Sequence, residues 1–182
     1  VLIGHSTGCQ KALHWADRRR ARGLAALVLL APCDDCAIVR RELGPQWRAM
    51  IRRARAKVRS GRGDELLVTR NPMCFSARRF LSLADPRRRE ASLFRYDGPM
   101  RAFRRLRCPT LAAFGDREPY AVRPVAEMLA RLRALRPDGR LDTVIVHGAD
   151  HSFHPRESEI ARLIAQWLRR VVSACRNTPA AV

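Results

Sequence analysis

The sequence predicts an α/β fold, in which a parallel sheet is flanked by helices. Short apolar runs recur along the chain, amphipathic helical segments lie between them, and the longest run is continuous rather than alternating. Continuous apolar runs are typical of parallel strands that are buried on both faces. The alternation of strand and helix indicates crossover connections between such strands, as expected for an α/β fold with a parallel sheet.

Four apolar runs are the expected strands. Residues 24–31 (LAALVLLA) form the longest run, and residues 110–114 and 143–146 form two more. Residues 1–3 have the composition of the end of a fourth strand.

Helices are expected between these strands. Residues 7–20 follow the first strand, and residues 122–136 place their apolar side chains on one helical face. Residues 160–175 repeat apolar positions at the i, i+3, i+4, i+7 spacing of an amphipathic helix. We expect residues 177–182 to be a frayed tail.

Residues 34–107 interrupt the alternation and are expected to form a mainly helical insertion that covers a site as a cap. This segment has no strong strand signal, and it contains 19 Arg and 1 Lys against 8 acidic residues. Amphipathic helices are expected around residues 47–58 and 76–84. The expected organisation is therefore an α/β core in residues 1–33 and 108–176, with the cap between them.

The composition argues for a globular protein and against two classes of partner. Hydrophobic residues make up 47% of the 182 residues, and no run approaches the length of a membrane span. The net charge of +19 comes from 34 Arg and 2 Lys that are spread over most helices, and aromatic residues are few. We therefore expect a solvated, Arg-rich surface of a cytoplasmic protein, rather than a nucleic-acid-binding or membrane surface.

The six cysteines predict neither a disulfide framework nor a metal site. Four of them lie in or beside apolar stretches, where cysteine acts as a small hydrophobic residue. Cys33 and Cys36 form a C-x-x-C pair, but no second pair accompanies it at zinc-ligand spacing. A redox role for this pair is the weaker alternative.

The motif with the clearest chemistry is Gly4-His5-Ser6-Thr7-Gly8, which matches G-x-S-x-G. It lies between a strand end and a helix, where a sharp turn lifts the serine hydroxyl above the sheet edge and glycines leave room for nearby backbone. The same turn places the Thr7 N–H at a helix N-terminus, where it can stabilise an oxyanion.

A nucleophilic serine needs a base, and the base must be oriented by an acid. Two later strands are each followed by a loop with suitable residues: GDREPY at 115–120 and HGADHSF at 147–153. Such loops at the carboxyl ends of parallel strands are where these folds place their sites. The order serine, acid, histidine is the order that this architecture requires.

From residue 1 to about residue 170 the chain resembles the carboxyl-terminal two-thirds of an α/β-hydrolase. The stretches GHSTGCQ, SARRFLSLADP and FGDREPY resemble a little-characterised branch that includes fungal hydrolases of siderophore esters. The resemblance implies Ser6 as nucleophile, the Thr7 N–H as one oxyanion donor, His151 as general base, and no cofactor.

The acid has several candidates. The family's spacing after the strand favours Glu118, with Asp116 as the alternative acid, while Asp34 and Asp35 follow an earlier strand and are outside candidates. For the base, the family pattern maps onto His151. His147 and His154 are the rivals, and they are expected to be surface or capping residues. We expect His5 to pack within the turn.

These residues predict a serine hydrolase that acts on a small ester, thioester or amide through an acyl-enzyme. The alternative is a non-catalytic hydrolase-fold protein whose basic cap holds an anionic partner. A lyase or a cofactor-free oxidoreductase on the same scaffold is a third interpretation.

The resemblance also implies strands that precede the serine motif in the family. We expect their absence to leave the first strand at a bare sheet edge, which favours self-association. We further expect a truncated chain with impaired activity, because the loop that supplies the second oxyanion donor in the family belongs to that earlier part.

Overall fold

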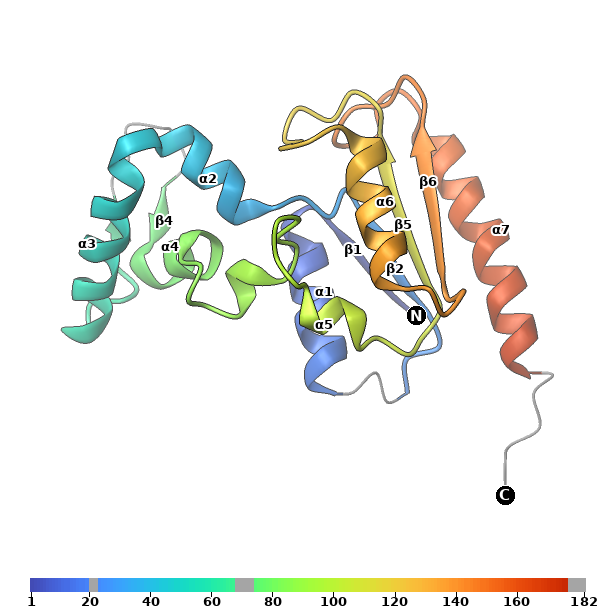
Figure 1. The fold of residues 1–182 in the computed structure, drawn as a ribbon, viewed down its shortest axis with the longest axis horizontal. Coiled ribbons are helices and arrows are strands. Elements are labelled where there is room, and N and C mark those ends of the chain that lie inside the picture. Colours follow the sequence, from blue (N-terminus) through green and yellow to red (C-terminus); the bar gives the residue numbers. More distant parts are fainter. Residues whose placement is uncertain (20–22, 68–73, 177–182) are drawn as a thin grey trace. The chain divides into compact units, whose positions relative to one another are not determined.

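The computed structural model describes residues 1–19, 23–67 and 74–176, and the chain divides into two compact units (Figure 1). The first unit comprises Val1–Cys33 and Arg101–Val182, and the second comprises Asp34–Met100. The second unit begins where the expected insertion begins, whereas residues 101–107 belong to the first unit. The tail expected at residues 177–182 lies outside the described residues.

The first unit is built on a four-stranded parallel sheet, which confirms the predicted α/β class. Its strands are β1 (Leu2–His5), β2 (Leu27–Leu30), β5 (Thr110–Gly115) and β6 (Leu141–Val146), in the order β1-β2-β5-β6. β6 begins two residues before the predicted start, because Leu141 and Asp142 pair with Thr110 and Leu111. β2 is shorter than the apolar run that predicted it.

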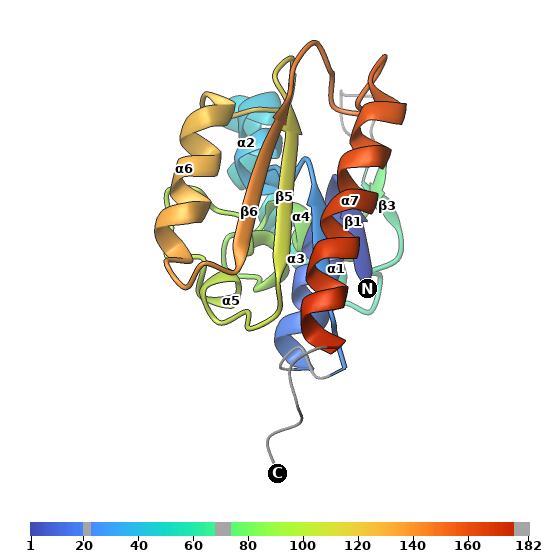
Figure 2. The same ribbon diagram turned by 90° about the vertical axis from the view of Figure 1, so that its right-hand side faces the viewer.

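Helices cover both faces of this sheet. α6 (Val125–Leu135) lies on one face and α7 (Glu157–Arg176) on the other (Figure 2). Trp167 of α7 packs with Val28 of β2 and Leu111 of β5 on one face of the sheet. The alternate residues Leu29 and Ala112 are fully buried as well, so both strands are apolar on both faces. α1 (Thr7–Arg18) contacts β1, and the short α5 (Arg101–Arg104) contacts α1.

The predicted start of α6 at residue 122 is wrong by three residues. The helix begins immediately after Pro124, whose backbone is extended with ψ 132°. The residue before a proline is disfavoured in the α region, so Arg123 could not continue a helix that began at Val122. The prediction for α7 was late by three residues, because the polar first turn at Glu157 carries no apolar signal.

The second unit has a hydrophobic core of its own. It contains α2 (Asp35–Leu43), α3 (Trp47–Arg59) and α4 (Ala77–Ala84), with single 3₁₀ turns at Gly44–Gln46 and Glu90–Ser92. The helices pack around buried residues that include Ile51, Ala54 and Phe80. β3 (Leu66–Leu67) and β4 (Phe75–Ser76) form a short antiparallel pair, too short for a periodic sequence signal.

No helix in the described part of the chain is both long enough and apolar enough to cross a bilayer. Cys33 and Cys36 are free thiols. The Cys36 thiol lies 3.4 Å from the carbonyl oxygen of Ala84, and burial raises the pKa of this thiol to about 11. Because the thiolate is the reactive form, this shift disfavours a redox role for Cys36.

Candidate active site

Ser6 occupies a sharp turn between β1 and α1. Its φ of 54° lies in the left-handed region, which is strained for any residue with a side chain. The Ser6 N–H donates to the Leu30 carbonyl (2.9 Å), which ties the turn to β2. Gly4 is required here, since a Cβ at this position would lie 2.6 Å from the carbonyl oxygen of Gly8.

The Ser6 hydroxyl is aimed at His151. Its Oγ lies 2.9 Å from Nε2 of His151, and Nδ1 of the same ring lies 2.8 Å from both carboxylate oxygens of Glu118. A carboxylate accepts hydrogen bonds, so Nδ1 carries the proton and donates to Glu118. Nε2 is then the unprotonated nitrogen that accepts the hydrogen bond from the Ser6 hydroxyl.

Glu118 is held in place by its own loop. Its side chain is fully buried, and one carboxylate oxygen also accepts the Tyr120 N–H at 3.1 Å. The two loops that carry Glu118 and His151 pack closely, because a Cβ on Gly115 would lie 2.3 Å from the carbonyl oxygen of Ala149. Glycine at the end of β5 therefore allows the acid and the histidine to meet.

Asp116, the alternative acid, contacts other groups. Its carboxylate accepts the Gly148 N–H at 2.7 Å and lies 3.2 Å from Nδ1 of His147. Desolvation opposes its ionisation, but these two partners outweigh that effect and keep the pKa of Asp116 below its ordinary value. Asp116 thus fixes the start of the histidine loop and makes no described contact with His151.

The two rival histidines are exposed and bind to carboxylates other than Glu118. His147 contacts Asp116, and His154 lies 3.6 Å from Asp150 and 3.3 Å from Glu157. Asp150 also accepts the N–H groups of Ser152 and His154, so it shapes the loop around His151.

The outside candidates for the acid, Asp34 and Asp35, belong to the second unit. The Asp34 carboxylate accepts the Ala37 N–H at 2.9 Å and caps the N-terminus of α2. Burial raises the pKa of Asp34 to about 6, against this hydrogen bond. Asp35 lies in the first turn of the same helix.

Three further residues surround the imidazole of His151. The His5 Nε2–H donates to the backbone carbonyl of His151 at 2.8 Å, so His5 holds the histidine loop. His5 is exposed, which differs from the expected packing within the turn. The Tyr120 ring meets the His151 ring edge to face, with 4.7 Å between their centroids. Tyr120 lies within the FGDREPY stretch, but its ring contact has no signal in the sequence.

Cys33 is the third neighbour, and it completes a donor set that could hold a metal ion. Its sulfur, a carboxylate oxygen of Glu118 and a ring nitrogen of His151 lie within 4.8 Å of one another. A cation bound there would compete with the proton that joins His151 to Glu118. Metal binding would therefore use the same His151 and Glu118 groups that form the hydrogen bond, and it would replace that hydrogen bond.

Thr7, the expected oxyanion donor, is the first residue of α1. N–H groups in the first turn of a helix lack an intrahelical acceptor and carry partial positive charge. The site thus combines a hydroxyl, a base with a defined tautomer, a buried carboxylate and a helix N-terminus. Together these groups could carry out acyl transfer through a serine nucleophile.

Comparison with solved structures shows the fold of this chain. It is similar to a monoacylglycerol lipase of Paleococcus ferrophilus (TM-score 0.54, 21% identity) and to a thermostable carboxyl esterase of Bacillus coagulans (TM-score 0.59, 15% identity). It is also similar to Est1E of Butyrivibrio proteoclasticus (TM-score 0.54, 16% identity). These matches cover 93%, 93% and 94% of this chain and establish an α/β-hydrolase fold.

The chain spans 67%, 64% and 60% of the lengths of these three proteins, in the same order. A search of curated protein sequences found no match. The sequence model of one family matches residues 1–175, which is nearly the whole chain. The chain therefore belongs to the family described as "Protein of unknown function (DUF1749)".

Proposed function

We propose that this protein is a serine hydrolase that cleaves a carboxylic ester, thioester or amide through an acyl-enzyme. The observation that carries the proposal is the continuous hydrogen-bonded chain from Ser6 through His151 to the buried Glu118, with heavy-atom distances of 2.8–2.9 Å. Three residues from three separate loops converge at the carboxyl ends of β1, β5 and β6. The α/β-hydrolase fold of lipases and esterases supports the same chemistry.

The proposed reaction begins with attack by the Ser6 oxygen on the substrate carbonyl while His151 Nε2 takes the hydroxyl proton. The imidazolium that forms is stabilised by Glu118, whose carboxylate is already in contact with Nδ1. His151 then donates the proton to the leaving group, and the acyl group stays on Ser6. A water molecule, activated by the same imidazole, releases the acid and restores the enzyme.

The negative charge that develops on the carbonyl oxygen needs donors that are already in place. We assign the Thr7 N–H to this role, because it directly follows the nucleophile and belongs to the first turn of α1. His5 is a positioning residue in this scheme, since it contacts the His151 backbone rather than the reacting atoms.

The substrate class is the less specified part of the proposal. Resemblance of GHSTGCQ, SARRFLSLADP and FGDREPY to the branch with siderophore-ester hydrolases makes such esters one class to test. The excess of Arg over acids in the second unit predicts, in addition, a mild preference for anionic or polar acyl groups.

The direct test is hydrolysis of p-nitrophenyl esters by the parent and by Ser6→Ala. We expect Ser6→Ala to lose all activity above the uncatalysed rate while keeping its circular dichroism spectrum and its melting temperature. A matched control is Ser152→Ala, an exposed serine of the histidine loop whose side chain has no described role. Activity of Ser6→Ala within tenfold of the parent would overturn the mechanism and favour the non-catalytic alternative.

A further inference from the structure

The second unit contains two cavities that take no part in the proposed chemistry. One has a volume of about 470 Å³ and the other about 270 Å³, and both are lined by Arg55 and Arg87. Because they share these residues, we describe them together as the arginine groove. Its basic side chains are Arg48, Arg52, Arg55 and Arg59 of α3, with Arg87 and Arg88 of the segment after α4.

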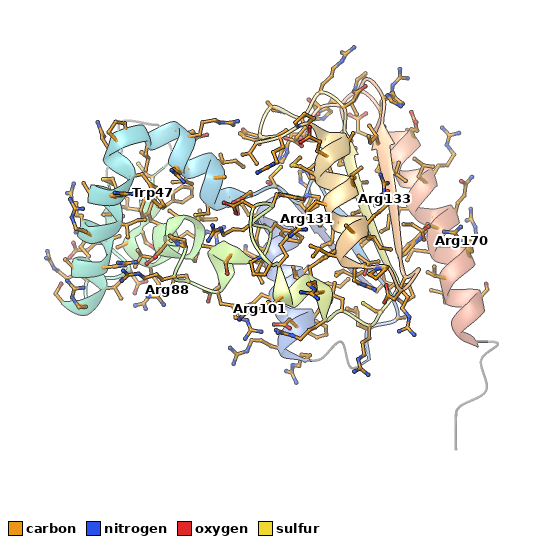
Figure 3. The ribbon with its side chains drawn as sticks, in the orientation of Figure 1. Trp47, Arg88, Arg101, Arg131, Arg133 and Arg170 are labelled. Atoms are coloured by element: carbon orange, nitrogen blue, oxygen red, sulfur yellow. The ribbon has the colours of Figure 1, made fainter. Side chains whose placement is uncertain are left out.

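The spacing of the basic residues on α3 explains how they gather. Relative to the first, they occupy positions i+4, i+7 and i+11, which lie on one face of a helix. The turn after Pro86 brings two more arginines to the same cavities. Figure 3 shows Arg88 of this segment, and Trp47 at the start of α3, on the second unit.

The floor of the arginine groove is apolar. Ile51 and Leu81 are buried core residues, and Val58 packs partly buried against the same core. Trp47 also lines it, and its ring is fixed because Nε1–H donates to the Ala84 carbonyl at 3.2 Å. A rigid apolar floor beneath charged walls fits a ligand that has both an ionic and a non-ionic part.

Asp85 is the one acidic residue among those that line the groove. It is already neutralised, since Arg55 donates two hydrogen bonds to its carboxylate at 2.6 and 2.8 Å. Burial alone would raise the pKa of Asp85, but Arg55 and the Arg87 N–H hold it below its ordinary value. Asp85 therefore anchors Arg55, and its single negative charge, which also interacts with Arg88, leaves most of the positive charge of the groove uncompensated.

Of the other five arginines of the groove, Arg88 interacts electrostatically with Asp85. The guanidinium groups of the remaining four have no acidic partner among the described residues: Arg48, Arg52, Arg59 and Arg87. Three other acids of the second unit form ion pairs away from the groove: Asp64 with Arg78, Glu65 with Lys57, and Asp97 with Arg95. The positive charge here is thus a local accumulation and not only a consequence of the overall composition.

We propose that the arginine groove binds a small organic phosphate that carries at least two negative charges and an apolar or planar portion. The planar guanidinium matches phosphate oxygens bidentately, and several arginines around one cavity can share a di- or triphosphate. The larger cavity, at about 470 Å³, has the volume of a small-molecule site, which favours a metabolite over a macromolecular polyanion. The proposal does not depend on the esterase chemistry.

Isothermal titration calorimetry of the full chain with ADP, pyrophosphate and adenosine tests whether the groove recognises both the phosphate portion and the planar portion of the ligand. We expect ADP to bind several-fold more tightly than pyrophosphate, because it also contacts the floor, and adenosine to bind far more weakly than either. The double variant Arg59→Gln/Arg88→Gln should weaken ADP binding by about tenfold or more. Both side chains are exposed, so a circular dichroism melt should match that of the parent.

The matched control is Arg53→Gln/Arg169→Gln, which removes two exposed arginines outside the groove and changes the net charge equally. It should retain the parent affinity within about twofold. If both double variants weakened ADP binding equally, the effect would come from long-range charge, and the proposed binding site would be contradicted. Absence of ADP binding, or displacement of ADP by short duplex DNA at equal phosphate concentration, would also contradict it. Ser6→Ala should bind ADP normally, so failure of the hydrolase proposal would leave this result unchanged.

Discussion

Glu118 and Asp116 are two residues apart in one loop, yet their carboxylates have different partners. Glu118 faces Nδ1 of His151 from a fully buried position, whereas Asp116 holds Gly148 and His147 at the surface. The loop geometry therefore places Glu118 where it can orient the base and Asp116 where it shapes a turn.

We predict that Glu118→Gln lowers kcat far more than Asp116→Asn does. Glutamine keeps the shape of the side chain but removes the charge that stabilises the imidazolium, and such a loss in a triad costs about 10⁴-fold. Asp116→Asn should cost less than about tenfold, through a looser histidine loop. Steady-state kinetics on one ester measures both, and the reverse ranking would transfer the role to Asp116.

Asp34 provides a pH-dependent prediction. Its pKa in the folded protein is about 6, above the ordinary value of 3.8, because burial disfavours the charged form. The folded state therefore holds this proton more tightly than the unfolded chain. The resulting stabilisation is fully present at low pH and is lost as pH rises through 6.

We predict that Asp34→Asn is more stable than the parent at pH 8, by up to about 3 kcal/mol, and that the difference shrinks at pH 5. Asparagine also caps helices well, so the hydrogen bond to α2 is retained. Urea unfolding at both pH values measures the difference. Parallel stability curves for the two proteins would show that Asp34 is not the group that titrates.

At the scale of single elements, the turn between β1 and α1 depends on one glycine and tolerates change at another. A Cβ at Gly4 would meet backbone atoms of Gly8 and Cys9 at 2.6–2.9 Å, whereas a Cβ at Gly8 would meet no atom within 4 Å. Both residues belong to the same motif, so they form a matched pair.

We predict that Gly4→Ala destabilises the protein by about 1–3 kcal/mol, because backbone and not a flexible side chain must move. Gly8→Ala should be neutral or stabilising by up to about 1 kcal/mol, because alanine favours the helix. Thermal and urea unfolding measure the change in stability of each variant relative to the parent. Equal destabilisation would mean that the turn is looser than the structure describes.

Much of the element order could be predicted, because strands such as β2 and β5 are buried on both faces and read as continuous apolar runs. α2 and the β3–β4 pair were not predicted. α2 has little apolar periodicity beyond Ile38 and Val39, and a two-residue strand has no period at all.

For the candidate site, positions after strand ends led to Ser6 and to the loops at 115–120 and 147–153, and the family resemblance then favoured Glu118 and His151 within those loops. The contacts of His5, Tyr120 and Cys33 could not be predicted in this way. They depend on how two loops distant in sequence pack together, as the close approach of Gly115 to Ala149 illustrates.

At the scale of the whole molecule, the sheet of the first unit has β1 at one edge. Ile3 of β1 is 51% exposed, and an edge strand presents backbone groups that can pair with another chain. The expected self-association through this edge therefore remains a prediction that a protein of residues 1–182 can test.

We predict that Ile3→Lys reduces concentration-dependent association, because it places a charge at the strand edge. Leu66→Lys is the matched control: Leu66 is 61% exposed but lies in the second unit, on β3. Sedimentation velocity over a range of concentrations measures both. An equal effect of the two substitutions would point to general surface hydrophobicity instead of strand pairing.

Activation of Ser6 as a nucleophile can be tested without knowing the substrate, because a fluorophosphonate reacts with a serine that a neighbouring base has activated. We predict one adduct per chain, mapped by mass spectrometry to the peptide that contains Ser6, with none in Ser6→Ala and strongly slowed labelling in His151→Ala. A folded parent protein that remains unlabelled, or an adduct on a different serine, would contradict the account.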